Sequence, residues 1–315
     1  MCKDFSCSLF PYTREDFLSI QEVRQEPSWS ISAFNLPEAW NLSQGEGVVV
    51  AVLDTGCDLD HPDLVDNLLD GKNMIDPSNP PEDGNGHGTH ITGTLVAANN
   101  ELGVVGVAPK AKVRPVKVLD DQGNGNLLHV AAGIRWCIEQ KVDIISLSLG
   151  APVPVQQVRK AIQAAAEAGI VTFCAAGNAG NTKEVFYPAA YPETIAIGAI
   201  DPAFRRADFS NTGKGLDFMA PGVDVMSTVP DNWYAKMSGT SMAQPFACGV
   251  AALLLSYARK NPHLGIKLET VDDYKNCFKK YTTPVENGNY TDPEFYQGFG
   301  IIDPRKFLQA MKQTH

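Results

Sequence analysis

Short apolar runs rich in β-branched residues alternate, from residue 48 onward, with longer runs that have helical apolar spacing. The first of them, VVVAVLD (48–54), is typical of a strand buried on both faces. We predict the following elements after it: helix 90–98, strand 111–120, helix 127–141, strand 142–150, helix 155–169, strand 170–178 and strand 194–200. This alternation predicts an α/β fold of three layers, with a doubly wound, mostly parallel sheet in the middle. In such sheets reactive groups gather at the carboxyl ends of the strands.

The composition fits a large globular core and an acidic charge balance. Of the 315 residues, 44% are hydrophobic, which is enough for one large core or two modest ones. The 26 basic and 36 acidic residues give a net charge of −10 without a basic block, so nucleic acid is not expected as a partner. No apolar stretch approaches the roughly 18 residues of a membrane span, so no membrane partner is expected either.

The N-terminus and the cysteines favour a reducing compartment. The first residues, MCKDFSCSLFPYTRED (1–16), have neither the apolar core nor the cleavage site of a secretory signal. The seven cysteines are an odd number without a CxxC pair, which indicates free thiols. We therefore expect a cytoplasmic protein.

The chain divides into an arm and one domain. Residues 1–25 are polar and mixed in composition, which is typical of an arm, whereas nothing between residues 31 and 310 looks like a linker. We therefore predict an N-terminal arm of residues 1–25 and a single domain of residues 26–315.

A serine stands where a turn of small residues meets an apolar helix, in SGTSMAQPFACGVAALLL (238–255). Ser241 could cap this buried helix, because a serine oxygen accepts an orphan backbone N–H. It could also be a nucleophile, because a helix N-terminus stabilises negative charge and Gly239 lets another backbone approach closely. A nucleophilic serine needs a base and an orienting acid, so the rest of the chain decides between the two.

Three further polar residues stand at or near predicted strand and helix ends. Asp54 ends the first predicted strand, His87 stands between glycines in DGNGHGTHITG, and Asn178 ends the segment AAGN. Each could be a turn or cap residue. His87 and His90 could instead bind a metal, although no third ligand is evident.

Together these residues meet the requirements of acyl transfer. Ser241 would attack a carbonyl, His87 would take its proton and pass it to the leaving amine, and Asp54 would orient the imidazole. Asn178 and the backbone N–H of Ser241 would donate hydrogen bonds to the oxyanion. We therefore predict Asp54, His87, Ser241 and Asn178 as catalytic residues.

Four segments resemble the signature blocks of the subtilisin-like serine proteases, in the family's order: VAVLDTG, NGHGTHITGT, AAGN and GTSMAQP. The resemblance runs from about Trp29 to Asp303, where GFGIID resembles the family's closing strand. It implies a serine endopeptidase that acts on polypeptides. Two alternatives remain open, a protease that processes one narrow substrate and a catalytically silent peptide-binding module.

The resemblance also implies a calcium site, because the loop AANNELGVVGVAP (97–109) resembles the family's calcium loop. The alternative is a solvated turn. All the implied ligand atoms are oxygens, as Ca²⁺ prefers. The implied ligands are the side chains of Asp63, Asn100 and Gln25 and the carbonyls of Ala98, Leu102 and Val104.

A substrate cleft is implied in the same way. Two segments would clamp an extended peptide between them, and a third would form a wall of the pocket for the residue before the cut. These segments are Gly123, Asn124 and Gly125; Ser148, Leu149 and Gly150; and Ala175, Ala176 and Gly177. Phe186 would lie on the floor of that pocket, where many relatives have a small residue, so we expect it to disfavour large aromatic side chains.

The arm contains LFPY (9–12), which resembles a motif in the short inhibitory N-terminal extension of the intracellular subtilisins. The resemblance implies that the arm inhibits its own protease, so that the chain is made as a zymogen. The alternative is an incidental proline in a disordered arm. Those relatives are commonly dimers, so a homodimer is a further possibility.

Overall fold

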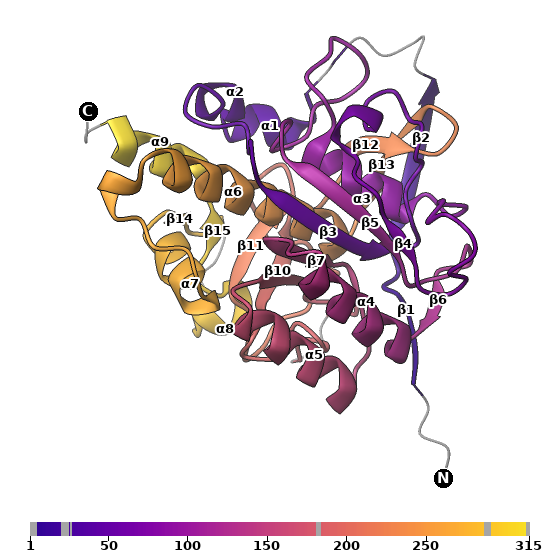
Figure 1. Ribbon diagram of the computed structural model, residues 1–315. Coiled ribbons are helices and arrows are strands. Elements are labelled where there is room, and N and C mark those ends of the chain that lie inside the picture. Colours follow the sequence, from indigo (N-terminus) through magenta and orange to yellow (C-terminus); the bar gives the residue numbers. More distant parts are fainter. Residues whose placement is uncertain (1–4, 20–24, 26, 181–183, 287–290, 313–315) are drawn as a thin grey trace.

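The computed structural model describes residues 5–19, 25, 27–180, 184–286 and 291–312. Within these residues a nine-stranded sheet forms the centre of the molecule, and all its neighbouring strands are parallel except β14 and β15 (Figure 1). The strands lie in the following order: β14 (Thr282–Thr283), β15 (Ile301–Ile302), β11 (Phe218–Pro221), β10 (Ile195–Ile200), β9 (Val171–Ala175), β7 (Ile144–Leu147), β3 (Val49–Asp54), β5 (Lys112–Lys117) and β4 (Lys72–Asn73).

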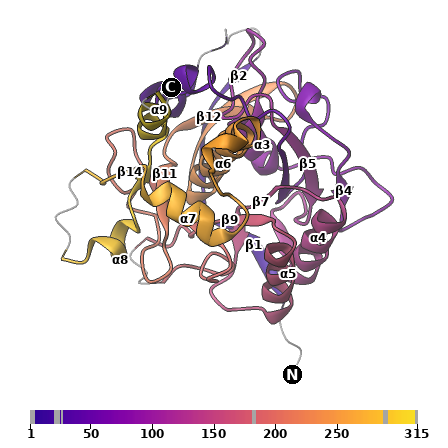
Figure 2. The same ribbon diagram turned by 60° about the vertical axis from the view of Figure 1, so that its left-hand side comes forward.

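Helices cover both faces of this sheet. The connection from β3 to β5 carries α3 (His87–Val96), whereas the connections that return to β7 and β9 carry α4 (Leu127–Glu139) and α5 (Gln156–Glu167). α3 lies on one face of the sheet, and α4 and α5 lie on the other (Figure 2). α4 and α5 lie side by side in both views, and α6 (Thr240–Lys260) packs against α3 (Figures 1 and 2). The predicted three-layer α/β fold is confirmed.

The remaining helices lie around this frame, and the interior of the sheet is apolar. Strands β7, β9 and β10 are buried along their whole length, because helices cover both faces. The other helical elements are α1 (Trp29–Ala33), α2 (Leu36–Ala39), α7 (Val271–Lys279), α8 (Pro293–Gln297), α9 (Pro304–Lys312) and the 3₁₀ turns Val65–Asn67 and Pro262–Leu264.

Helix α6 corrects one expectation from the sequence. Among the described residues it is the one helix that is long and apolar enough, by length and composition, to cross a membrane. However, 94% of its apolar window is buried inside the fold, which is the usual situation of a core helix. Its apolar character is therefore explained by the layers of side chains around it.

The arm contains two strands that join small sheets at the surface. Strand β1 (Ser6–Leu9) lies between β6 (Asn124–Asn126) and β8 (Leu149–Gly150) and is antiparallel to both. Strand β2 (Thr13–Ser19) pairs in antiparallel orientation with a hairpin that directly precedes α6 in the chain. In Figure 1 the two strands of the arm, in indigo, lie on the right-hand side of the molecule.

The hairpin consists of β12 (Val225–Val229) and β13 (Trp233–Ser238), and β2 pairs with the outer edge of β13. The arm therefore follows the domain surface from β6 and β8 to β13. The boundary at residue 25 between arm and domain stays a prediction.

Candidate active site

Asp54 and His87 are brought together by the end of a strand and the start of a helix. Asp54 is the last residue of β3 and His87 the first of α3. Nδ1 of His87 lies 2.8 Å from Oδ1 of Asp54, and both side chains are fully buried. In a neutral imidazole ring, a proton on Nδ1 that donates to the Asp54 carboxylate leaves Nε2 as an acceptor. Within the described part of the chain, this buried Nε2 has no hydrogen-bond partner.

Asp83 fixes the two elements relative to each other, and sequence reasoning missed it. One carboxylate oxygen of Asp83 accepts from the Thr55 hydroxyl at 2.8 Å, and the other accepts from the backbone and hydroxyl of Thr89 at 2.9 and 2.6 Å. The N–H of Gly88 donates to the Thr55 hydroxyl at 3.0 Å. A Cβ atom on Gly88 would lie 2.1 Å from the Gly56 carbonyl oxygen, so this approach requires glycine.

Ser241 is the second residue of α6, and it does not cap the helix. The N-cap position belongs to Gly239, and no side chain makes a capping hydrogen bond there. The buried Ser241 hydroxyl donates to the Ser148 carbonyl at 3.2 Å. His87 and Ser241 each lie in the first turn of a helix, and these two helices, α3 and α6, pack against each other.

Asn178 has its amide oriented by Thr240, a second residue that sequence reasoning missed. The amide oxygen of Asn178 accepts from the Thr240 backbone at 2.9 Å and from its hydroxyl at 2.6 Å. The amide nitrogen is thereby turned outward and donates to the Pro11 carbonyl of the arm at 2.8 Å. Thr240 lies next to Ser241 in the signature block, so position along the chain was a usable signal.

The two predicted cleft segments hold the arm as a middle strand. Cys7 pairs with Gly125, Ser8 pairs with both Asn124 and Gly150, and Leu9 pairs with Leu149. A further hydrogen bond runs from the Leu9 N–H to the Gly123 carbonyl at 2.9 Å. Of these segments Ser148 is the exception, because its carbonyl accepts from Ser241.

The predicted pocket beside these segments holds the ring of Phe10. Phe10 is only 4% exposed, and its ring centroid lies 5.9 Å from that of Phe186. A Cβ atom on Gly150 would come within 2.8 Å of the Phe10 ring, so glycine makes room for it. Phe186 donates its N–H to the Ala176 carbonyl at 3.0 Å, and a Cβ atom on Gly177 would lie 3.1 Å from the Phe186 ring.

A phenyl ring therefore fits next to Phe186. The expectation that Phe186 disfavours large aromatic side chains before the cut stays a prediction, because the carbonyl that accepts from Asn178 is that of Pro11 and not that of Phe10. Ala175 ends β9 and is fully buried below this wall.

The ring of Tyr12 covers that of His87. Its ring centroid lies 4.9 Å from that of His87, and its hydroxyl donates to Oδ1 of Asn85 at 3.3 Å. Burial raises the pKa of the Tyr12 hydroxyl above its usual value. The arm thus contacts the pocket through Phe10, Asn178 through Pro11 and His87 through Tyr12.

A metal bound by His87 and His90 does not fit this arrangement. Nε2 of His90 points away from the cleft, at 3.0 Å from the Val225 carbonyl and 3.1 Å from the Ala235 carbonyl. Burial lowers the pKa of His90 to about 3, so the ring is neutral. Among the residues that the structure describes, no three His, Cys, Asp or Glu side chains are grouped as metal ligands.

The implied calcium loop brings several oxygens around two side-chain amides. Nε2 of Gln25 donates to the carbonyls of Ala98 and Val104 at 2.8 and 3.3 Å. Nδ2 of Asn100 donates to Oδ1 of Asp63 at 3.1 Å. A half-turn of each amide would direct its oxygen to the same place.

Asp63 is also held from its other side. Its Oδ2 accepts from the Val104 N–H at 3.0 Å and from the Tyr234 hydroxyl at 2.9 Å, and burial raises its pKa. Leu102, which is 40% exposed, donates its N–H to Oδ1 of Asn100 at 3.1 Å. An all-oxygen donor set with one carboxylate could hold Ca²⁺.

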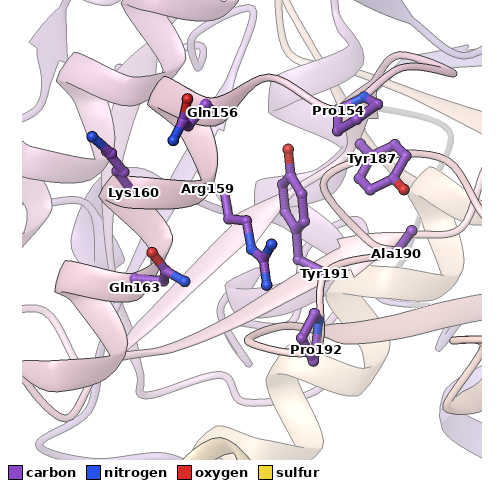
Figure 3. A pocket seen from close by; sticks show the side chains of 9 residues that line it. All are labelled: Pro154, Gln156, Arg159, Lys160, Gln163, Tyr187, Ala190, Tyr191 and Pro192. Atoms are coloured by element: carbon purple, nitrogen blue, oxygen red, sulfur yellow. The ribbon is translucent and has the colours of Figure 1, made fainter.

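A cavity of about 630 Å³ lies between α5 and the 187–192 segment, away from these residues (Figure 3). Its walls include Tyr187 and Tyr191, and Arg159 forms an ion pair with Glu193 at 3.1 Å near its rim. None of the four predicted catalytic residues lines it.

The fold and the site are those of a serine protease built on an α/β frame. The sequence pattern of the Subtilase family matches residues 45–300, and the chain belongs to this family. An intracellular serine protease of Paenibacillus polymyxa is 46% identical over 275 residues, which cover 85% of this chain and 83% of that protein.

Two further relatives show the same relationship. The major intracellular serine protease of Bacillus subtilis (strain 168) is 42% identical over 264 residues, with 80% of this chain and 82% of that protein covered. Subtilisin E of the same organism is 43% identical over 305 residues, with 95% of this chain and 75% of that protein covered. The predicted family and enzyme class, a subtilisin-like serine endopeptidase, are therefore confirmed.

Proposed function

We propose that the protein is an endopeptidase that uses Asp54, His87 and Ser241 as a triad, with Asn178 in the oxyanion hole, and that its own arm inhibits it. The observation that carries the proposal is the pairing of two features. The His87 ring is held by Asp54 with Nε2 left as an acceptor. Beside it, Asn178 already donates to a peptide carbonyl, that of Pro11.

The first half of the reaction forms an acyl-enzyme. When a substrate carbonyl lies between Ser241 and Asn178, the Ser241 hydroxyl turns from the Ser148 carbonyl to Nε2 of His87. Its oxygen attacks the carbonyl carbon while Nε2 takes the proton, and Asp54 stabilises the imidazolium. The amide of Asn178 and the N–H of Ser241 donate to the oxyanion.

The second half releases the enzyme. His87 gives the proton to the leaving amine, the C–N bond breaks, and the C-terminal product departs. A water molecule then loses a proton to Nε2, attacks the acyl carbon and frees the Ser241 oxygen, which takes the proton back. Thr240 supports both halves, because it keeps the Asn178 nitrogen directed at the reacting carbonyl.

The position of the arm supports its proposed role as an inhibitor. It lies in the cleft as a substrate would, with β1 between β6 and β8 and Phe10 in the pocket. Proline lacks the N–H that a bound strand would donate, and its fixed φ bends the chain. The Ser241 hydroxyl meanwhile donates to the Ser148 carbonyl. Its tether gives the arm an effective concentration near millimolar, which favours occupancy.

Calcium is the proposed cofactor, held by oxygens of Asp63, Asn100 and Gln25 and by the Ala98, Leu102 and Val104 carbonyls. Bound there, it would stabilise the loop through ligand–oxygen bonds. The convergence of carbonyl and carboxylate oxygens on two amides supports this assignment. We further propose a cytoplasmic location, in line with the printed names of two relatives. The possible homodimer stays a prediction.

Substitution of Ser241 by alanine tests the proposal. Ser241→Ala removes one oxygen, so it should abolish peptide hydrolysis while the melting curve stays close to that of the parent. Digestion of a mixed peptide library by the parent would separate broad from narrow specificity. Hydrolysis by Ser241→Ala at the parent rate would contradict the triad, and a parent chain that binds peptides without cutting them would be a silent binding module.

A further inference from the structure

The arm continues beyond the catalytic residues along the outer edge of β13. Thr13 pairs with Ser238 and Arg14 with Met237, in antiparallel register. The carbonyl that accepts from Asn178 is that of Pro11, whereas the ring beside Phe186 is that of Phe10. The arm therefore has one more residue than a substrate between the pocket and Asn178. The bond to be cut in a substrate would lie where the Pro11–Tyr12 bond lies in the arm. Counted from this bond, Arg14 is the third residue on the leaving-group side.

The side chain of Arg14 enters a pocket of about 670 Å³ whose walls carry five carboxylates. We call it the acidic pocket; its acidic residues are Asp58, Asp60, Glu82, Asp83 and Asp231. Nη1 of Arg14 donates to the Asn85 carbonyl at 3.3 Å, and a Cβ atom on Gly86 would lie 3.2 Å from the same nitrogen.

The carboxylates of this pocket divide into a fixed base and an exposed rim. Asp58 and Asp83 are only 4% and 3% exposed, and backbone N–H groups hold both, including that of Asp231 on Asp58 at 3.0 Å. Asp60 and Glu82 are exposed at the rim. Among the described residues that line the pocket, Arg14 is the one with a positive charge.

A pocket with five carboxylates and one guanidinium loses its cation when the arm leaves. Like charges that face one another at short range repel, and a substrate cation would relieve that repulsion. The backbone edge of β13 would align the substrate chain, because main-chain pairing along an edge is independent of side-chain identity. Pairing with β13 therefore determines which substrate residue reaches the acidic pocket, and the carboxylates of the pocket favour a positively charged side chain there.

We propose that the acidic pocket is a specificity subsite that selects an arginine or lysine side chain at the third position after the bond to be cut. The proposal rests on the proposed function, because it takes the arm to be bound as a substrate is. It goes beyond the triad and the pocket of Phe10, which lie before the cut.

Quenched fluorescent peptides test this subsite. Three peptides share one sequence with phenylalanine before the cut and carry arginine, glutamine or glutamate as the third residue after it. A fourth is an isomer of the first, with its arginine moved to the sixth position. The full-length protein is assayed after its peptidase activity has reached a plateau, and mass spectrometry verifies the cut.

The kcat/KM values should fall in the order arginine, glutamine, glutamate, with roughly tenfold between the extremes, because several carboxylates act together on one cation. The isomer should be cut no faster than the glutamine peptide. Raising the salt to 1 M should compress the ratio, since the Debye length falls to about 3 Å.

A double variant that neutralises two carboxylates tests whether they cause the preference for arginine. Asp60→Asn with Glu82→Gln keeps the size of both exposed side chains and should reduce the ratio of arginine to glutamate to about threefold. The matched control is Asp272→Asn with Glu269→Gln, because both of these acids are exposed near α7; it should keep the parent ratio.

Three results would overturn the proposal while the protease itself stands. These are equal rates for the arginine and glutamate peptides, an isomer that is cut as fast as the arginine peptide, and an unchanged ratio in the Asp60→Asn, Glu82→Gln variant. The second would assign the preference to the net charge of −10. If no peptide is cut and Ser241 proves unreactive, the proposed function fails instead.

Discussion

The two halves of the arm are held in different ways. Strand β1 is hydrogen-bonded on both edges and is followed by Phe10, which is 4% exposed in its pocket. Among the described residues strand β2 pairs with one strand, β13, and Arg14 donates to the Asn85 carbonyl in a pocket lined by five carboxylates. Burial of a phenylalanine contributes about 1.5–3 kcal/mol, whereas partly exposed ion pairs contribute about 0–1 kcal/mol. The difference indicates that the β1 half provides most of the affinity of the arm for the cleft, whereas the β2 half mainly fixes the path of the chain after the cleft.

Asn178 contacts the arm at Pro11, between its two halves. Its substitution should have the largest effect on catalysis. Asn178→Ala should lower kcat by about 10²–10³, the loss seen when the oxyanion-hole asparagine of a subtilisin is removed, with little change in KM. Its effect on arm binding should be small, because one neutral hydrogen bond contributes only about 1 kcal/mol. Steady-state kinetics of the processed protein measure this. An unchanged kcat would remove Asn178 from the oxyanion hole.

Substitutions in each half test the comparison directly. In the full-length chain, Phe10→Ala should raise the initial peptidase rate roughly 10²-fold, because a buried ring is lost. Arg14→Gln should raise it only about two- to fivefold. Rates are taken before the arm is cut, as checked by mass spectrometry. If Arg14→Gln activates as strongly as Phe10→Ala, the β2 half is the main inhibitory contact and the comparison is reversed.

Pro11 links the two halves. Pro11→Ala restores an N–H and frees φ, so a carbonyl of the arm can settle against Ser241. Because small displacements of reacting atoms change rates strongly, self-cleavage of the arm should accelerate by about tenfold. A time course of N-terminal processing measures this, with Phe10→Ala as a variant that should release the arm without faster cutting. Equal processing rates in Pro11→Ala and the parent would show that the proline does not protect the bond.

Removal of calcium provides the smallest expected effect. A chelator should lower Tm by roughly 5 °C, since a ligand at 100 times its Kd adds about 2.7 kcal/mol to the free energy of unfolding. Asp63→Ala should remove most of this sensitivity. Gln25 joins the calcium loop to the end of the arm, so hydrogen exchange should rise in β2 and not in β1. Identical melting curves with and without chelator would exclude the site.

The local pattern of apolar residues and motifs was sufficient to predict the central strands and helices and to identify the four signature blocks. The first strand was predicted at 48–54 and lies at Val49–Asp54, and the helix predicted at 127–141 is Leu127–Glu139. These elements bury near-continuous or periodic apolar runs, which a sequence displays directly. The contact between Asp54 and His87 was predicted because a triad needs an acid that orients its base.

Contacts between distant segments could not be predicted in this way. Asp83, Thr240 and the acidic pocket depend on side chains that meet only after the sheet has formed. The partners of β1 are more than 110 residues away, at Asn124–Asn126 and Leu149–Gly150. The direction of the Phe186 ring likewise depends on packing, so its size alone does not define the shape of the pocket.

Labelling of Ser241 by a fluorophosphonate tests the central claim, that a triad serine is covered by its own arm. The rate of labelling is followed in the full-length chain before and after the arm is lost, with Ser241→Ala as the control. We predict one label per chain, located on Ser241, none in the control, and labelling at least about tenfold slower while the arm is attached. Labelling of Ser241→Ala, or the same rate with and without the arm, would contradict the account.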